Sequence, residues 1–300
     1  MLTMQQQQEL VQQGFAKKKF NPELNINTYK YTKKVMYEYL WNKYPELLEC
    51  RGHGYDATTG EPVVFAPKKT FNYLEDGHWS DVPLDTKVKV FKKFNGFMST
   101  VSVHYGKVIV STTGTTDSKY VEMAKEMIFK TWPEEGIRKW CKDTEASKGS
   151  WMFEIIHAND PHIVDEGSPQ AKYLGYRDIN GFTPVYNTPE WAEWAEMHEI
   201  TLGQALEKVK DFKGEGFMLY DLQGNVCKLK SPYYVGKKKL MRMTDSRIDQ
   251  MFANPDKYFK ENMPVSWMWF TDTINDYLTE STWKSMGEQE RREFIEDFED

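Results

Sequence analysis

Residues 87–106 read KVKVFKKFNGFMSTVSVHYG, and this stretch decides the fold expected for the chain. Polar and apolar side chains alternate over residues 87–91 and again over 97–105, the pattern of strands that are buried on one face. A break and a third alternating run over 107–112 predict that the second strand continues into a hairpin. The polar segment Lys93-Phe-Asn-Gly96 therefore joins two predicted strands.

Further helices and strands are expected on both sides of this stretch. Apolar residues at helical spacing predict helices over 27–48 and 118–131. Thr188-Pro189 and the capping-box pattern Thr201-Leu-Gly-Gln204 predict two more helix starts. Three more strands are predicted, over 151–156, 217–221 and 226–230, and the last two form a hairpin around Gln223-Gly224.

The order of these elements indicates an α+β fold of antiparallel sheets with flanking helices. Strands and helices do not alternate, and the sequence contains neither GxGxxG nor GxxxxGK[ST], which disfavours a Rossmann sheet and a P-loop. Strand signals fade after about residue 243, and the remaining residues have mainly helical patterns. We therefore predict two domains, residues 1–243 and a small helical domain over 244–300.

Composition indicates a folded globular protein, because 15% of the 300 residues are aromatic and 28% are charged. No apolar run approaches the roughly 20 residues of a membrane helix, and residues 1–15 lack a signal-peptide pattern. These observations predict a soluble intracellular protein. Cys50, Cys141 and Cys227 form no CxxC pair and are odd in number, so we expect small buried side chains and not a zinc site or a disulfide framework.

Charge is unevenly distributed along the chain. The net charge of −6 argues against a protein that coats nucleic acid by bulk attraction. Residues 222–244 nevertheless contain six basic residues and no acid, whereas residues 286–300 contain seven acids and two arginines. The basic stretch suits a polyanion held in a defined site, although a lysine cluster alone is usually a solvated face.

Four short motifs combine charged side chains with strands or glycines. In Lys93-Phe-Asn-Gly96, the glycine permits close approach of a ligand, and a lysine amine becomes a nucleophile when burial or nearby positive charge favours its neutral form. Glu154 and Glu215 are single acids in apolar strands, which require a polar partner such as a ribose or a metal. Lys228-Leu-Lys230 puts two cations on one strand face, as a phosphate site or as protection of an edge strand.

These motifs, in order along the chain, resemble the motif set of covalent nucleotidyltransferases, which includes polynucleotide ligases and mRNA-capping enzymes. The full series is Arg51-Gly52, Lys69-Thr-Phe-Asn72, Lys93-Phe-Asn-Gly96, Phe153-Glu154, Leu174-Gly-Tyr-Arg-Asp178, Glu215-Gly216 and Lys228-Leu-Lys230. The upstream Arg51 and Lys69, and Tyr233-Tyr234 after the last motif, make the chain similar to the phage tRNA-repair branch of RNA ligases. The resemblance covers roughly residues 20–243.

The resemblance implies an ATP-dependent RNA ligase with a nucleotidyltransferase domain of ATP-grasp-like antiparallel sheets. It implies that Lys93 carries AMP, that Glu154 binds the ribose and that Glu215 helps to hold Mg²⁺ or Mn²⁺, with Glu154 as a second metal candidate. Phosphate contacts are implied for Lys228, Lys230, Arg51 and Lys69. Nucleotide-site positions are implied for Asn95, Gly96, Arg177 and Tyr234. The expected substrates are RNA 3′-OH and 5′-phosphate ends, including tRNA, and the expected enzyme is monomeric and, if phage-encoded, acts in the host cytoplasm.

The chain departs from the family pattern at two places. Asn95 stands where the family has an acid two residues after the lysine, and we find no motif of a C-terminal OB domain. The second departure favours an RNA ligase with its own helical tail. The alternatives are a DNA ligase, a capping guanylyltransferase, or a non-catalytic RNA-binding protein that uses the basic stretch around Lys237–Lys239.

Overall fold

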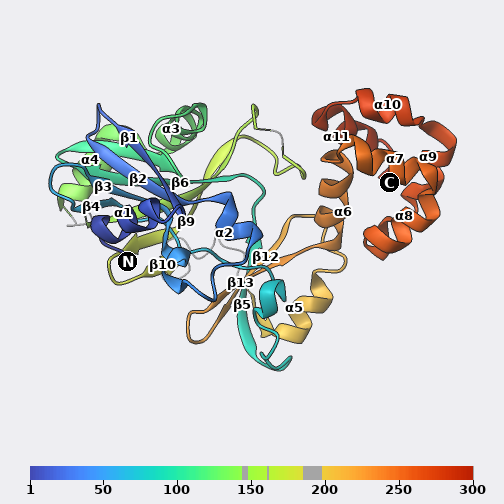
Figure 1. Cartoon of the computed structure of the whole chain (residues 1–300), viewed down its shortest axis with the longest axis horizontal. Coiled ribbons are helices and arrows are strands. Elements are labelled where there is room, and N and C mark those ends of the chain that lie inside the picture. The colour runs from blue at the N-terminus through green and yellow to red at the C-terminus, as the bar shows by residue number, and fades with distance from the viewer. Residues whose placement is uncertain (144–147, 161, 185–197, 300) are drawn as a thin grey trace. The chain divides into compact units, whose positions relative to one another are not determined.

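The computed structural model describes residues 1–143, 148–160, 162–184 and 198–299 (Figure 1). The chain forms two compact units and crosses between them several times. Unit 1 comprises Met1–Thr70, Gly96–Ala158 and Gly167–Ala195, and unit 2 comprises Phe71–Asn95, Asn159–Glu166 and Glu196–Asp300. The predicted domain boundary at 243/244 lies within unit 2, and the two domains stay a prediction.

Unit 1 contains two antiparallel sheets. The first has the order β1-β2-β3-β4, with strands Ala16–Asn21, Ile26–Tyr31, Arg51–Asp56 and Pro62–Val64. The second has the order β10-β9-β8-β6-β7, with β6 at Phe97–His104, β7 at Lys107–Thr112, β8 at Gly149–Ile156, β9 at Gln170–Asp178 and β10 at Phe182–Pro184. Its helices are α1 (Met4–Gln12), α2 (Lys33–Tyr37), α3 (Lys119–Thr131) and α4 (Glu134–Asp143), with a 3₁₀ turn η1 at Pro45–Glu49.

Alternation along β8 determines which of its side chains enter the core of unit 1. Trp151, Phe153 and Ile155 are buried in one cluster with Ile128 of α3. Glu154 points to the opposite face of the strand, because successive strand side chains alternate. The sheet therefore directs this carboxylate away from the core that α3 covers.

Unit 2 combines one antiparallel sheet with helices. The sheet order is β11-β5-β12-β13, with strands His198–Thr201, Lys87–Lys93, Gly216–Asp221 and Val226–Lys230. Helix α5 (Leu202–Lys208) begins with the predicted capping box of Thr201 and Gln204. The remaining helices are α6 (Pro232–Met241), α7 (Asp245–Ala253), α8 (Pro255–Asn262), α9 (Phe270–Tyr277), α10 (Glu280–Ser285) and α11 (Glu288–Glu296), with 3₁₀ turns η2 (Glu75–Gly77) and η6 (Val265–Trp267).

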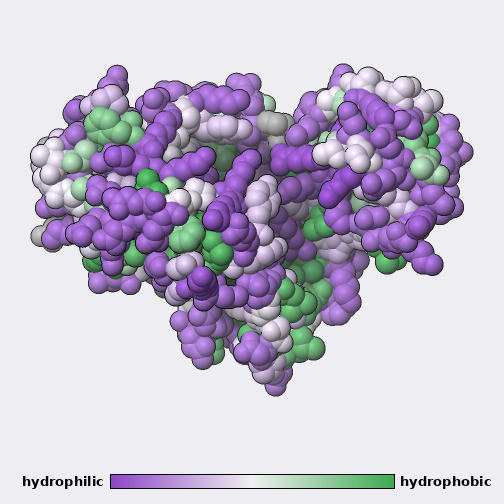
Figure 2. All heavy atoms as spheres, viewed as in Figure 1, coloured by the Kyte–Doolittle hydropathy of each residue, from purple (hydrophilic) through white to green (hydrophobic). Residues whose placement is uncertain are grey.

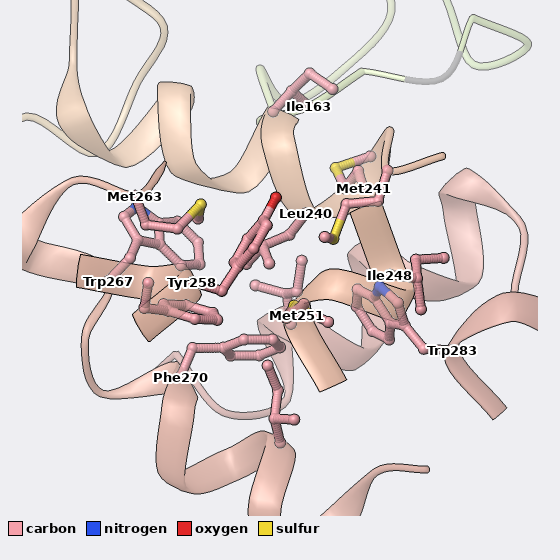
Figure 3. Packing of buried hydrophobic residues seen from close by; sticks show 14 of the residues in the cluster. Ile163, Leu240, Met241, Ile248, Met251, Tyr258, Met263, Trp267, Phe270 and Trp283 are labelled. Atoms are coloured by element: carbon pink, nitrogen blue, oxygen red, sulfur yellow. The ribbon is translucent and has the colours of Figure 1, made fainter. Parts of the chain in front are cut away.

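The helices of unit 2 from α6 onward share one hydrophobic core (Figure 3). Leu240 and Met241 of α6 lie in it together with Trp267, Phe270 and other side chains of the later helices. Hydrophilic residues cover most of the face of these helices that Figure 2 shows. Apolar burial against the later helices therefore supports α6, the element that follows the Lys228-Leu-Lys230 strand.

Most of the predicted elements are confirmed, and one is wrong. Residues 27–48 are not one helix, because Ile26–Tyr31 forms β2 between β1 and β3 and only Lys33–Tyr37 is α-helical. Alternating β-branched and aromatic residues favour a strand here, and their pairing partners on both sides outweigh the helical spacing. The helix start predicted at Thr188-Pro189 lies outside the described residues. The described residues from 245 to 299 contain helices and no strand, as predicted.

The three cysteines are free and buried, as the sequence predicted. Burial raises the pKa of the Cys50 and Cys227 thiols to about 12, so both stay protonated at neutral pH. No helix among the described residues is long and apolar enough to cross a membrane.

Candidate active site

Strand register in unit 2 brings two lysines to one carboxylate. Gly216 at the start of β12 lies opposite both Lys93 at the end of β5 and Lys230 at the end of β13. Glu215 directly precedes Gly216, and its carboxylate is 2.9 Å from the Nζ of Lys93 and 3.7 Å from the Nζ of Lys230. The lysine side chains are 19% and 24% exposed, whereas that of Glu215 is 5% exposed. Two partly exposed amines therefore lie close to one buried carboxylate.

Two glycines of the predicted motifs are required by close approaches of the backbone. Gly216 has a φ of 137°, and a Cβ at this position would be 2.1 Å from the Leu229 carbonyl oxygen. A Cβ on Gly96 would be 2.2 Å from the carbonyl oxygen of Ile155. In unit 1, the bare Gly96 backbone donates a hydrogen bond from its N–H to the Glu154 carboxylate at 3.1 Å. Each glycine thus allows a neighbouring strand to pass close to a motif.

The contacts of Asn95 explain why an amide stands where the family has an acid, two residues after the lysine. Its buried side-chain oxygen accepts hydrogen bonds from the N–H groups of Ile163 (2.8 Å) and Val164 (3.0 Å). Its Nδ2 donates to Glu215 at 3.3 Å, and its backbone N–H donates to Glu166 at 2.9 Å. An aspartate could not donate to Glu215 and would put a second negative charge beside it. The amide therefore fits this position better than a carboxylate does.

Strand β13 and helix α6 hold the other lysine and an aromatic ring. The backbone of Lys228 hydrogen-bonds to Phe71 and Tyr73, so the outer edge of β13 is already covered. This pairing weakens the interpretation of the lysines as protection for an open edge. The Nζ of Lys230 lies 4.9 Å from the centre of the buried Tyr234 ring. Lys228 is half-buried on the same strand.

Lys230 lies in a strongly cationic environment. Burial lowers its pKa to about 8, the positive charges of Lys238 and Lys93 act in the same direction, and Glu215 opposes them. An amine with such a lowered pKa gains stability as a cation when a phosphate group comes near it. The arrangement can therefore bind an anion at Lys230.

Unit 1 contains further cations among the predicted site residues. Arg51 of β3 lies opposite Lys30 of β2, and like charges in directly opposed positions of a sheet are unfavourable. Burial, and then the charge of Arg51, lower the pKa of Lys30. Lys30 donates a hydrogen bond to the Thr113 hydroxyl at 3.3 Å. The Nζ of Lys69 lies 5.7 Å from the centre of the Trp41 ring, in a cation–π contact.

Arg177 lies in a cluster of basic side chains around Glu49 in unit 1. Its guanidinium donates to the Glu49 carboxylate at 2.6 Å, and Lys68 and His53 approach the same carboxylate at 3.1 and 3.3 Å. Burial alone would raise the pKa of Glu49, but the hydrogen bond from His53 and the charges of Arg177 and Lys68 hold it well below its ordinary value. Arg177 is buried, so its most direct role is to fix the segment next to Arg51. Its implied place in a nucleotide site stays a prediction.

The predicted site residues are thus divided between the two units. Unit 2 brings together Lys93, Asn95, Glu215, Lys230 and Tyr234, with Lys228 on the same strand as Lys230. Unit 1 contains Gly96 with Glu154, and also Arg51, Lys69 and Arg177.

Sequence reasoning missed three charged residues beside the predicted site residues. Glu166 is 71 positions from Asn95, in a segment with no pattern to indicate it. Lys30 was hidden by the mistaken helix over 27–48. Lys238 had been named only within the basic stretch Lys237–Lys239, because α6 had not been predicted. Contacts that no local pattern encodes put Lys30 opposite Arg51 in unit 1, and put Glu166 and Lys238 beside Asn95 and Tyr234 in unit 2.

The described residues contain no group of three or more His, Cys, Asp or Glu side chains placed to hold a metal ion. Mg²⁺ commonly binds through one or two carboxylates and completes its octahedral shell with waters and substrate phosphates. The single carboxylate of Glu215, at the edge of an anion-binding group, fits that mode of binding. It does not fit a metal site made from protein ligands alone.

Comparisons with known proteins place the fold. No family model and no curated protein matches the sequence. The structure is similar to that of an archaeal ATP-dependent RNA ligase (form 1), with a TM-score of 0.56 and 11% identity over 90% of this chain and 74% of that one. It is also similar to a putative ATP-dependent DNA ligase from Aquifex aeolicus, with a TM-score of 0.51 and 11% identity over 97% and 77% of the two chains. The chain therefore has an α+β fold of antiparallel sheets and helices that it shares with these ATP-dependent ligases.

Proposed function

We propose that this protein is an ATP-dependent RNA ligase that forms a covalent lysyl-AMP at Lys93. The observation that carries the proposal is the strand register that gathers Lys93, Glu215 and Lys230 in unit 2. A lysine amine can serve as the nucleophile of nucleotidyl transfer, and a second cation can stabilise the charge that develops on the phosphate. The fold shared with ATP-dependent ligases supports the same proposal.

The first step is attack of Lys93 on the α-phosphorus of ATP. The ammonium of Lys93 first loses a proton to solvent and leaves its ion pair with Glu215. Its nitrogen then forms a P–N bond while the bond between the α-phosphorus and the pyrophosphate oxygen breaks, and pyrophosphate leaves. Negative charge grows on the phosphate oxygens in this step, and Lys230 is positioned to stabilise it.

Two further displacements complete the ligation. An oxygen of an RNA 5′-phosphate attacks the lysyl-AMP phosphorus, the P–N bond breaks, and Lys93 recovers a proton. An RNA 3′-hydroxyl then attacks the activated 5′-phosphorus, loses its proton and expels AMP, which seals the strand. When bound, Mg²⁺ would neutralise charge on the phosphate oxygens, and Glu215 is the residue of unit 2 that would help to hold it.

We extend the proposal to RNA repair, with tRNA among the substrates, on the resemblance of Arg51, Lys69 and Tyr234 to the tRNA-repair branch. In this proposal residues 1–243 act as the adenylyltransferase domain and residues 244–300 as a helical C-terminal domain. The roles that the resemblance implies for Arg51, Lys69 and Glu154 are tested by their own alanine variants.

The alternative enzymes differ in the nucleotide that they retain and in the nucleic acid on which they act. A DNA ligase would seal nicked DNA, and a capping guanylyltransferase would retain GMP in place of AMP. A non-catalytic RNA-binding protein would bind RNA in a salt-dependent way and form no adduct. The buried position of Lys237 removes one cation from the basic surface that this last alternative needs.

The test is incubation of the protein with labelled ATP or GTP and Mg²⁺, followed by denaturing electrophoresis. We expect label from ATP alone on the wild-type chain and none on Lys93→Ala. RNA and DNA with 3′-OH and 5′-phosphate ends are then compared as substrates, and we expect RNA to be sealed. Retention of GMP, a labelled Lys93→Ala variant, or sealing of DNA alone would contradict the proposal.

A further inference from the structure

Helix α6 carries three successive lysines with different surroundings. Lys237 is 1% exposed, Lys238 is half-buried, and Lys239 is exposed. Successive residues on a helix point about 100° apart, so the three side chains leave the helix in different directions. The contacts of Lys237 and Lys238 indicate a different role for each side chain.

Lys237 links α6 to the C-terminal residues of the described chain through ion pairs. Its Nζ lies 2.9 Å from Glu296 and 3.0 Å from Glu299, and it also donates to the Tyr233 hydroxyl at 3.0 Å. A buried cation with three partners resists displacement, because moving it would leave charges unpaired in the interior. The rotation of α6 about its axis is therefore fixed, and with it the direction of Lys238.

Lys238 is directed toward the Lys93–Glu215–Lys230 group. Its Nζ lies 5.7 Å from the centre of the Tyr234 ring, the same ring that Lys230 approaches at 4.9 Å. Burial lowers the pKa of Lys238, the charges of Arg242 and Lys93 lower it further, and Glu215 raises it. The ammonium thus shares an electrostatic environment with the candidate nucleophile and the carboxylate.

The charges in this group do not balance. Lys93, Lys230 and Lys238 bring three positive charges, and Glu215 and Glu75 bring two negative charges. Concentrating like charges in a half-buried group is unfavourable unless an anion lies among them. A phosphate-bearing substrate would supply that anion.

We propose that Lys238 is a further substrate-binding residue, which contacts a phosphate group of ATP beside Tyr234 and Lys230. This inference rests on the proposed function and deepens it, because it adds a residue that no motif indicated. Lys237 then acts as a positioning residue, which holds α6 so that Lys238 faces the phosphates.

The experiment measures binding of ATP and of AMP by calorimetry in the full-length Lys93→Ala protein, where no adduct can form. Adding Lys238→Ala should weaken ATP binding roughly 10- to 100-fold, as expected for loss of a charged hydrogen bond. Lys239→Ala, on the same helix and with the same charge, is the matched control and should change binding by less than about twofold. Lys238→Gln, which replaces the ammonium with a neutral polar group on a slightly shorter side chain, is measured if Lys238→Ala does not fold.

Comparing ATP with AMP shows which phosphate group Lys238 contacts. Weaker binding of ATP alone assigns Lys238 to the β- or γ-phosphate, and equal weakening of AMP assigns it to the α-phosphate. Unchanged ATP affinity in Lys238→Ala or Lys238→Gln, or equal loss in Lys239→Ala, would overturn the inference. A wild-type chain that binds ATP but forms no adduct would contradict the proposed function and leave the result for Lys238 standing. A chain that binds no ATP would overturn both.

Discussion

Glu49 in unit 1 and Glu215 in unit 2 are both carboxylates surrounded by basic groups, yet the two clusters differ in access to solvent. The partners of Glu49 include Arg177 and His53, whose side chains are 5% and 0% exposed. The lysines next to Glu215 are 19% and 24% exposed. In the first cluster the arginine and the histidine are buried and Lys68 at the rim is 63% exposed, whereas in the second cluster both lysines are partly exposed and within reach of a ligand.

The two clusters also differ in the type of basic residue, because Arg177 contacts Glu49 whereas Lys93 and Lys230 lie next to Glu215. Arginine stays protonated and forms planar, directed ion pairs, which suits a structural contact. Lysine changes protonation state readily when it is buried or near other cations, which suits a nucleophile. The comparison therefore predicts that damage to the Glu49 cluster affects stability and that damage to the Glu215 cluster affects chemistry.

The largest effect is expected for Lys93→Arg. The substitution keeps the positive charge next to Glu215 but supplies a guanidinium that does not lose its proton. We expect no AMP adduct and an unchanged melting temperature, measured by gel labelling and thermal unfolding. A labelled Lys93→Arg protein would show that the nucleophile lies elsewhere.

Lys230→Ala comes next. It removes a cation from the place where charge develops in the transition state, so adduct formation should slow about 100- to 1,000-fold. Single-turnover kinetics with saturating ATP measure the rate. An equal loss in Lys210→Ala, an exposed lysine of the same unit, would indicate a general effect of charge and contradict this role.

Arg177→Met tests the cluster around Glu49. It leaves Glu49 with only Lys68 and His53, and we expect the free energy of unfolding to fall by about 3 kcal/mol. Urea unfolding measures the change. If the variant keeps its stability and instead loses ATP affinity, Arg177 belongs to the nucleotide site that the resemblance implies and not to a structural cluster.

A smaller effect is expected for Asn95→Asp, which restores the acid of the family pattern. The new carboxylate cannot donate to Glu215 and repels it, so stability should decrease by about 1–2 kcal/mol. Asn95→Ser, which keeps a donor, is the comparison variant. An increase in stability for Asn95→Asp would show that the amide is not required by its neighbours.

The smallest effect concerns pH. The pKa of Glu49 is held below its ordinary value in the folded protein, so its stabilising contribution is present above about pH 4.5 and is lost as the pH falls below that value. The difference in melting temperature between wild type and Glu49→Gln should therefore shrink between pH 5 and pH 3. A constant difference over this range would contradict the ionic account of the cluster.

Local patterns predicted much of the fold. Alternation over 87–91 and 97–105 and the hairpin at 217–230 correspond to β5, β6, β12 and β13. The helix predicted over 118–131 is α3, and Val121 and Ala124 on its inward face are buried. These features depend on side-chain periodicity and capping, which a sequence displays directly.

The remaining features depend on long-range contacts. Ile26–Tyr31 became a strand because partners were available on both sides, which helical spacing could not reveal. Motif order identified Lys93, Glu215 and Lys230 as candidates, but not that register puts both lysines opposite Gly216. The buried position of Arg177 and the direction of Lys238 follow from packing of distant segments.

The most direct test is peptide mass spectrometry of the wild-type chain after incubation with ATP and Mg²⁺. Our account predicts one AMP per chain, joined through a phosphorus–nitrogen bond to Lys93 and released by acid. A chain that stays unmodified while ATP is bound, or one that carries AMP on a different residue, would contradict it.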